Sequence, residues 1–225
     1  MSAVSDQGML LRRIAYGETS LIVHVLTSGH GRLSLMARGA RRKNSDFRGM
    51  LEPLSLLKLS WRTGRTGMGT LTSIERENLL VPETHMYAGL DLNAIASGLF
   101  KEGSPDGFDE LVFAFQLLKC RPEDSGLLAA AWFLLHKSGW VGDLDQCWSC
   151  GKSDNPMRWS NAQLHCSVCG QGISVSLGLL RGILGHLNSP RVSLPEHDLD
   201  TWLAMTQEVL RMHGLRPLSA FNLLL

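Results

Sequence analysis

The chain has 225 residues, a formal net charge of +1 and 44% hydrophobic residues. It can bury a sizeable core, it is long enough for two domains, and its composition is that of an ordinary globular protein. The first residues lack the charged head and apolar run of a signal peptide, and the longest apolar stretch, Leu127 to Leu135, is too short to span a bilayer. We therefore expect a cytoplasmic protein without a membrane partner.

The net charge is divided unevenly along the chain. Residues 1–65 carry eleven Lys and Arg against four Asp and Glu, a balance of +7, whereas the remainder carries eleven against seventeen, a balance of −6. This asymmetry predicts a basic N-terminal module followed by an acidic body.

Five short segments with β-like patterns open the chain, and the connection between the third and the fourth is long. They are residues 9–16, 20–27, 32–38, 53–61 and 68–75. This arrangement predicts a five-stranded OB-fold barrel, an oligonucleotide-binding architecture, although a small SH3-like barrel fits almost as well.

The long connection, residues 39–52, is here named the basic loop. The strand before it alternates Leu33, Leu35 and Ala37 with polar or larger residues, as a half-buried strand does. Six cations lie within seventeen residues against one acid, Asp46, and we predict that they bind an extended polyanion such as a nucleic acid: Arg32, Arg38, Arg41, Arg42, Lys43 and Arg48. The alternative is a cluster of solvated surface charges.

Few aromatic residues of this module are available for base stacking. The candidates are Tyr16, Phe47 and Trp61, and each is more typical of a core than of a stacking platform. We therefore expect binding to rest mainly on phosphate contacts, with little sequence preference.

After Val81 and Pro82 the hydrophobic period changes from two to about 3.6 residues, which predicts domains at 1–81 and 82–225. Helical stripes follow at residues 108–118, 127–135, 177–187 and 199–210, the first behind Ser104-Pro105 and the third before Asn188-Ser189-Pro190. The predicted fold class is α+β, with a barrel followed by a mostly helical domain.

Four cysteines form two C-x2-C pairs separated by fifteen residues: Cys147, Cys150, Cys166 and Cys169. This spacing predicts a structural zinc site in a ribbon-like segment, residues 144–172, embedded in the helical domain. Four sulfur ligands leave no position for a metal-bound water; iron is the minor alternative, and a redox dithiol is weaker still. His165 is expected to be a surface residue rather than a ligand, and Cys120 a buried thiol.

Signatures of enzymes are missing from the sequence. No G-x-x-x-x-G-K-[ST] phosphate loop occurs, and no H-x-E accompanies the cysteines as it does in zinc deaminases. We predict a binding protein without catalytic activity. A protein associated with RNA or the ribosome, and a metalloenzyme that uses the cysteine cluster, remain the competing interpretations.

Several of these runs resemble a known family. The runs Tyr16-Gly17-Glu18-Thr19-Ser20, His30-Gly31-Arg32-Leu33-Ser34, Ala37-Arg38-Gly39-Ala40-Arg41-Arg42 and Leu51-Glu52-Pro53 resemble the N-terminal signature of the RecO family of bacterial recombination mediators. Leu144-Asp145-Gln146-Cys147 and Cys150-Gly151 resemble its second landmark. The C-terminal region resembles the family only in its helical pattern.

The resemblance implies an OB-fold domain, a helical domain and an embedded zinc-ribbon-like segment. It further implies binding of single- and double-stranded DNA and annealing of complementary strands. Partners implied by the resemblance are RecR, single-strand-binding protein and, indirectly, RecA, which would be loaded onto coated single strands. It assigns no residues of this chain to those protein partners.

Overall fold

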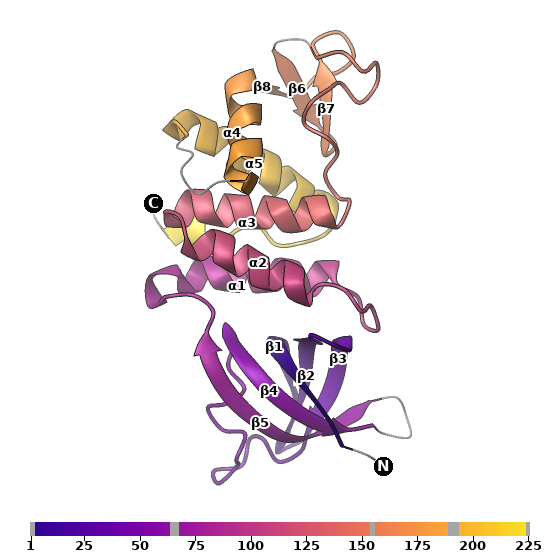
Figure 1. Ribbon diagram of the computed structural model, residues 1–225, viewed down its shortest axis with the longest axis vertical. Helices are drawn as coiled ribbons and strands as arrows, with labels where there is room; N and C mark the ends of the chain where they lie inside the picture. Colours follow the sequence, from indigo (N-terminus) through magenta and orange to yellow (C-terminus); the bar gives the residue numbers. More distant parts are fainter. Residues whose placement is uncertain (1–2, 64–67, 154–155, 189–193, 224–225) are drawn as a thin grey trace. The chain divides into compact units, whose positions relative to one another are not determined.

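A computed structural model describes residues 3–63, 68–153, 156–188 and 194–223 of the chain. The chain folds as two compact units, Met1–Val112 and Phe113–Leu225. Strands dominate the start of the first unit and helices the second (Figure 1). The predicted α+β class is confirmed. No helix among the described residues has the length and apolar character needed to cross a membrane.

Five strands close a barrel in the first unit, in the order β1-β2-β3-β5-β4 (Figure 1). Their bounds are β1 (Ala3–Tyr16), β2 (Ser20–Thr27), β3 (Gly31–Ala37), β4 (Ser55–Arg62) and β5 (Gly69–Leu79). The closure between β3 and β5 is parallel, and among the described residues it is short, with Leu35 opposite Gly69 and Met36 opposite Thr70. Alternate side chains point inward, so the barrel has its own apolar core around Leu10, Val25, Leu35, Leu57, Leu59 and Trp61.

The first strand is longer than the sequence predicts. Ala3 to Met9 pair with β4, and Gly8 to Tyr16 pair with β2, so one strand serves two neighbours. The predicted strand starts at Met9 because the preceding polar residues, Ser5 to Gln7, hide the pattern. The predicted turn between the fourth and fifth strands includes residues 64–67, which lie outside the described residues.

A short 3-10 helix, η1 (Glu83–His85), and α1 (Met86–Leu99) follow the barrel in the first unit. The buried Asn93 side chain of α1 donates hydrogen bonds to the carbonyls of Leu10 and Leu11 of β1, both at 3.0 Å. These bonds between uncharged groups satisfy buried polar atoms on both sides. They fix α1 against the barrel.

The remaining helices are α2 (Phe108–Lys119), α3 (Glu123–Lys137), α4 (Leu177–Asn188) and α5 (Glu196–Met212), with η2 (Ala220–Leu223) near the end. The division between the units falls within α2. In the second unit α3 packs against α4 and α5. Residues 189 and 190, predicted to stop α4, lie outside the described residues. Cys120 is exposed, so the predicted buried thiol is wrong: two residues beyond Leu118, it lies on the opposite side of the α2 stripe.

A three-stranded sheet, β7-β6-β8, carries the four-cysteine segment in the second unit. It consists of β6 (Met157–Ser160), β7 (Gln163–Cys166) and β8 (Ile173–Val175). Trp159 of β6 is fully buried, and its ring centroid lies 5.4 Å from that of Trp132 in α3. Trp132 in turn lies 6.3 Å from Trp202 in α5. This cluster of three indoles anchors the sheet in the core of the second unit.

Candidate nucleic-acid interface and metal centre

The basic loop leaves β3 through a glycine and then folds as a series of turns. Gly39 has a φ of +69°, in the left-handed region that glycine adopts without a steric penalty. The amide of Arg42 donates to the Gly39 carbonyl at 3.0 Å, and that of Ser45 to the Arg42 carbonyl at 3.2 Å. The amide of Arg41 donates to the Thr19 carbonyl at 2.8 Å, which ties the loop to the turn between β1 and β2. These backbone hydrogen bonds therefore fix the positions of the Cα atoms that carry the basic side chains of the loop.

Five of the six predicted cations gather on this loop and the residue before it. They are exposed, and in the described ranges none has a carboxylate oxygen within 4.0 Å; they are here named the loop cations, Arg38, Arg41, Arg42, Lys43 and Arg48. Arg41 donates to the carbonyl of Gly17 at 3.2 Å, and Arg48 to that of Lys43 at 3.3 Å. Peptide carbonyls do not neutralise a guanidinium, so this face keeps its positive charge.

Arg32, the sixth predicted cation, lies on β3 and turns toward α1. Its Nη1 donates to the carbonyls of Ser97 and Phe100, both at 2.6 Å. These carbonyls belong to the C-terminal end of α1, where a cation is favoured. The adjacent Gly31 has a φ of +62° and allows the backbone of residue 104 to approach closely. The structure thus gives Arg32 a helix-capping contact, and its contact with DNA stays a prediction.

Arg13 joins the basic surface although the sequence analysis did not select it. Its Nη1 donates to the carbonyl of Leu51 at 2.8 Å and to the Glu52 carboxylate at 2.9 Å. Both partners belong to the end of the basic loop, so Arg13 holds that end against β1. Nothing in the local sequence distinguishes Arg13 from Arg12, because both are exposed on β1 and the partners of Arg13 lie 38 and 39 residues further along the chain.

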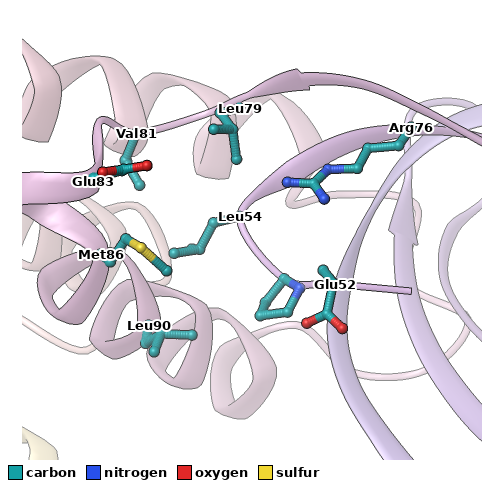
Figure 2. Close-up of a pocket in the computed structure, with 9 residues that line it drawn as sticks. Glu52, Leu54, Arg76, Leu79, Val81, Glu83, Met86 and Leu90 are labelled. Atoms are coloured by element: carbon teal, nitrogen blue, oxygen red, sulfur yellow. The ribbon is translucent and has the colours of Figure 1, made fainter. Parts of the chain in front are cut away.

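A second feature of the first unit is an apolar hollow of about 360 Å³ near the start of β4, here named the Leu54 hollow. Its lining is Glu52, Pro53, Leu54, Arg76, Leu79, Val81, Glu83, Met86 and Leu90. Figure 2 shows Leu54, Met86 and Leu90 directed toward one another across it. With two acids and one arginine on its walls, this hollow has no excess of positive charge. It does not suit a polyanion.

The structure brings the four predicted metal ligands together. Their sulfur atoms all lie within 4.8 Å of one another, and those of Cys150 and Cys166 are 3.7 Å apart. Tetrahedral zinc with bonds of about 2.3 Å requires sulfur atoms roughly 3.8 Å apart. Each C-x2-C pair is a tight turn: the Gly151 amide donates to the Cys147 carbonyl at 2.9 Å, and the Cys169 amide to the Cys166 carbonyl at 3.2 Å. The cluster fits a single metal ion.

The protonation of the cluster also favours a cation. Burial acts to raise the pKa of Cys147, but backbone hydrogen bonds from Cys166, Cys150 and Ser149 outweigh it and lower this pKa to about 6. The pKa of Cys169 rises to about 12, chiefly through its hydrogen bond with Cys166. The pKa of Cys166 is lowered and that of Cys150 is raised, so the cluster divides into two thiols that ionise more easily and two that keep their protons. A divalent cation would supply the charge that lets all four become thiolates. His165 lies beside the cluster, 3.3 Å from the Ser149 hydroxyl.

Known proteins align with both parts of the chain. The family model described as Recombination protein O N terminal matches residues 1–79, and the model Recombination protein O C terminal matches residues 84–220. Among curated relatives, the DNA repair protein RecO of Pasteurella multocida is 41% identical over 92 residues, 40% of this chain and 38% of the relative. That of Glaesserella parasuis is 30% identical over 157 residues, 67% of this chain and 65% of the relative.

A third relative, the DNA repair protein RecO of Actinobacillus succinogenes, is 35% identical over 104 residues, 45% of this chain and 44% of its own length. The alignments thus span less than two thirds of each of these relatives. The family models, in contrast, cover nearly the whole chain and meet between the barrel and the helices. This chain belongs to the RecO family.

Proposed function

We propose that this chain is a DNA-binding recombination mediator that acts in DNA repair, and that the loop cations hold the phosphates of single- and double-stranded DNA. The barrel is proposed to be an OB-fold, since its strand order places β5 between β3 and β4 around a closed sheet. The observation that carries the proposal is the set of five exposed cations without carboxylate partners in the described ranges. The names of the relatives, DNA repair protein RecO, point to the same substrate.

The proposed role of the four cysteines is structural, with zinc as the metal. All four ligands come from the protein, so the coordination shell would be closed to water and substrate. The proposed protein therefore has no catalytic step of its own. Its site of action would be the bacterial cytoplasm, at the nucleoid.

The proposed mechanism is annealing without an energy source. Complementary strands repel each other through their phosphates, and a basic surface lowers this barrier and raises the local concentration of strands. Base pairing then drives the reaction. The acidic second half of the chain would be available to RecR and to single-strand-binding protein, and through them the protein would help to load RecA onto coated strands.

The decisive experiment removes four of the loop cations together, by substituting Arg38, Arg41, Arg42 and Lys43 with alanine. Each lost phosphate contact lowers the slope of log affinity against log salt by about 0.7 for single strands, so the slope should fall by roughly three. Affinity should fall for duplex as well as for single strands. Annealing should weaken with it and should need no ATP.

A matched comparison uses pairs of substitutions with equal loss of charge. Arg41→Ala with Arg42→Ala should reduce the salt slope, whereas Lys58→Ala with Arg62→Ala, both exposed on β4, should change it little. If the quadruple variant kept its affinity and its slope, DNA would bind elsewhere. A single-stranded RNA competitor that displaced DNA at far lower concentration than DNA itself would favour the RNA-binding alternative.

A further inference from the structure

A second hollow of the first unit adjoins the loop cations. It is open, has a volume of about 430 Å³, and is here named the Phe47 hollow; its lining is Arg13, Ala15, Leu21, Ala40, Arg41, Phe47, Arg48, Gly49, Leu51 and Glu52. This volume falls in the range of about 300–1,000 Å³ typical of small-molecule sites. All of its walls come from the barrel and the basic loop. A ligand bound there would touch the same surface that is proposed to hold DNA.

The floor of the hollow is apolar and firmly held. Leu51 and Ala40 are 2% and 7% exposed and belong to the core of the barrel. Leu21 and Phe47 are partly buried and pack against that core. Phe47 therefore cannot swing freely, yet it also lines the hollow. A fixed aromatic edge or face at an open site costs little conformational entropy when a flat ligand packs on it.

The rim is cationic. Three arginines line it, and the acid among them, Glu52, is already paired with Arg13. Arg41 and Arg48 each use Nη1 for one bond to a peptide carbonyl. Their remaining guanidinium donors have no carboxylate partner in the described part of the chain. Two arginines are thus placed to receive an anion at the mouth of an apolar hollow.

An apolar floor beside a cationic rim favours some of the ligands that a basic surface could bind over others. Phosphates alone would engage the rim but leave the apolar floor exposed to water. A duplex presents phosphates outward and keeps its bases stacked inside, so it cannot fill the floor. An unpaired nucleotide carries a flat base, whose faces can pack on apolar and aromatic side chains, next to a phosphate, and single-stranded DNA offers such nucleotides at every position. The Leu54 hollow, with its mixed charges, offers no such match.

We propose that the Phe47 hollow binds one unpaired nucleotide of single-stranded DNA, with the base packed against Phe47 and its phosphate at Arg41 and Arg48. This inference rests on the proposed function and assigns the same surface a preference for single strands. Only one base per protein would be held, so the neighbouring bases would stay free to pair during annealing. A larger aromatic platform would sequester them.

The test compares Phe47→Leu with Phe47→Tyr, using an oligothymidylate and a blunt-ended duplex as probes. Leucine keeps apolar packing on the core but removes the ring, so affinity for the oligothymidylate should fall about tenfold with an unchanged salt slope. Affinity for the duplex should stay within twofold, and tyrosine should preserve both. An equal loss for both probes, or no loss for either, would overturn the proposal.

Two further measurements keep the test independent of the stability of the Phe47 variants. Ala15→Leu adds volume at an exposed wall of the hollow and should also weaken only single-strand binding. With the wild-type chain, a single strand containing one 2-aminopurine should change its fluorescence on binding, whereas the same base in a duplex should not. Suppose that the quadruple cation variant loses all DNA binding, but that the Phe47 variants affect single strands and duplex equally. That result would refute nucleotide binding in the Phe47 hollow and leave the proposed function intact.

Discussion

The basic loop and the four-cysteine segment both gather like charges, but they do so in opposite ways. The loop cations spread over an exposed face, where Arg41 and Arg48 donate to peptide carbonyls. The four sulfur atoms converge to within 4.8 Å of one another, and two of the cysteines are buried. Repulsion between the loop cations is small because water screens it, whereas repulsion among four thiolates would be strong because their sulfur atoms lie so close together.

The charges of the loop cations are therefore suited to binding a ligand, whereas those of the four cysteines contribute to folding. An exposed cation can be removed with little effect on stability, because it loses no buried partner. A converging set of thiolates needs its counter-ion at all times, and the ion then becomes part of the fold.

Removing the metal should destabilise the second unit without weakening DNA binding. Cys147→Ser combined with Cys166→Ser deletes both buried ligands, and we expect the free energy of unfolding to fall by at least about 3 kcal/mol. For a chain of this size that lowers the melting temperature by roughly 10 °C. Calorimetry and elemental analysis would measure stability and bound metal, and DNA affinity of the folded fraction should persist.

The matched control is Cys120→Ser, since Cys120 is exposed and lies outside the cluster. It should change neither metal content nor melting temperature. If the wild-type chain stripped of metal melted at its original temperature, the cluster would not be a structural centre. Loss of DNA affinity in the double variant would show that the two charge clusters are not separate in function.

Arg32, on β3, and Arg38, directly after β3, offer the same contrast between a charge that stabilises the fold and a charge that is free to bind DNA. Arg32→Met removes the donor to the carbonyls of Ser97 and Phe100 and should cost about 2 kcal/mol. Arg38→Met removes an exposed cation without a carboxylate partner in the described ranges and should change stability by less than about 0.5 kcal/mol.

The two substitutions should affect DNA affinity in the opposite order: Arg38→Met should weaken DNA binding more than Arg32→Met does. Urea denaturation and fluorescence anisotropy of labelled single strands would measure the two effects. Equal destabilisation by both substitutions would remove the distinction between a capping arginine and a binding arginine.

These two arginines also show what a sequence can and cannot predict. The spacing of the cysteines and the alternation of β2 and β3 are local patterns, and the structure has both where the sequence places them. The capping role of Arg32 depends on a helix more than fifty residues away, and nothing in a charged stretch separates such a residue from its exposed neighbours. Arg13 was missed for the same reason, because its partners Leu51 and Glu52 are distant in sequence.

The elements that the sequence analysis missed share another property: their polar residues interrupt the expected period. No helix was predicted at α1, which buries Asp91 and Asn93 among its apolar residues. The first half of β1 pairs with β4 through Ser5, Asp6 and Gln7. In both cases tertiary pairing, rather than local pattern, stabilises the element. The Phe47 hollow likewise arises only when the basic loop folds back beside β1.

The smallest predicted effect concerns the hairpin that joins the two cysteine pairs. The turn between β6 and β7 consists of Asn161 and Ala162, with φ values of 53° and 59°, so both residues are left-handed as a type I′ turn requires. Asparagine tolerates this region, whereas alanine does so at a cost of about 1 kcal/mol. Ala162→Gly removes that cost but loses a buried methyl group and adds freedom to the unfolded chain. Ala162→Gly should therefore raise the free energy of unfolding, by less than about 1 kcal/mol.

The reverse substitution provides the control for this prediction. Gly17 has a φ of +56° and open space where a methyl group would be added, so Gly17→Ala isolates the same backbone cost without a clash and should destabilise the barrel by about 1 kcal/mol. Both variants can be measured by urea denaturation, with and without a chelator. If the metal, rather than the turn, orders the four-cysteine segment, the gain from Ala162→Gly should be far smaller than the loss on chelation. If Ala162→Gly instead restored the stability that the chain loses in the presence of a chelator, the hairpin would be what orders the cysteines. Their convergence would then be a property of the backbone that precedes metal binding.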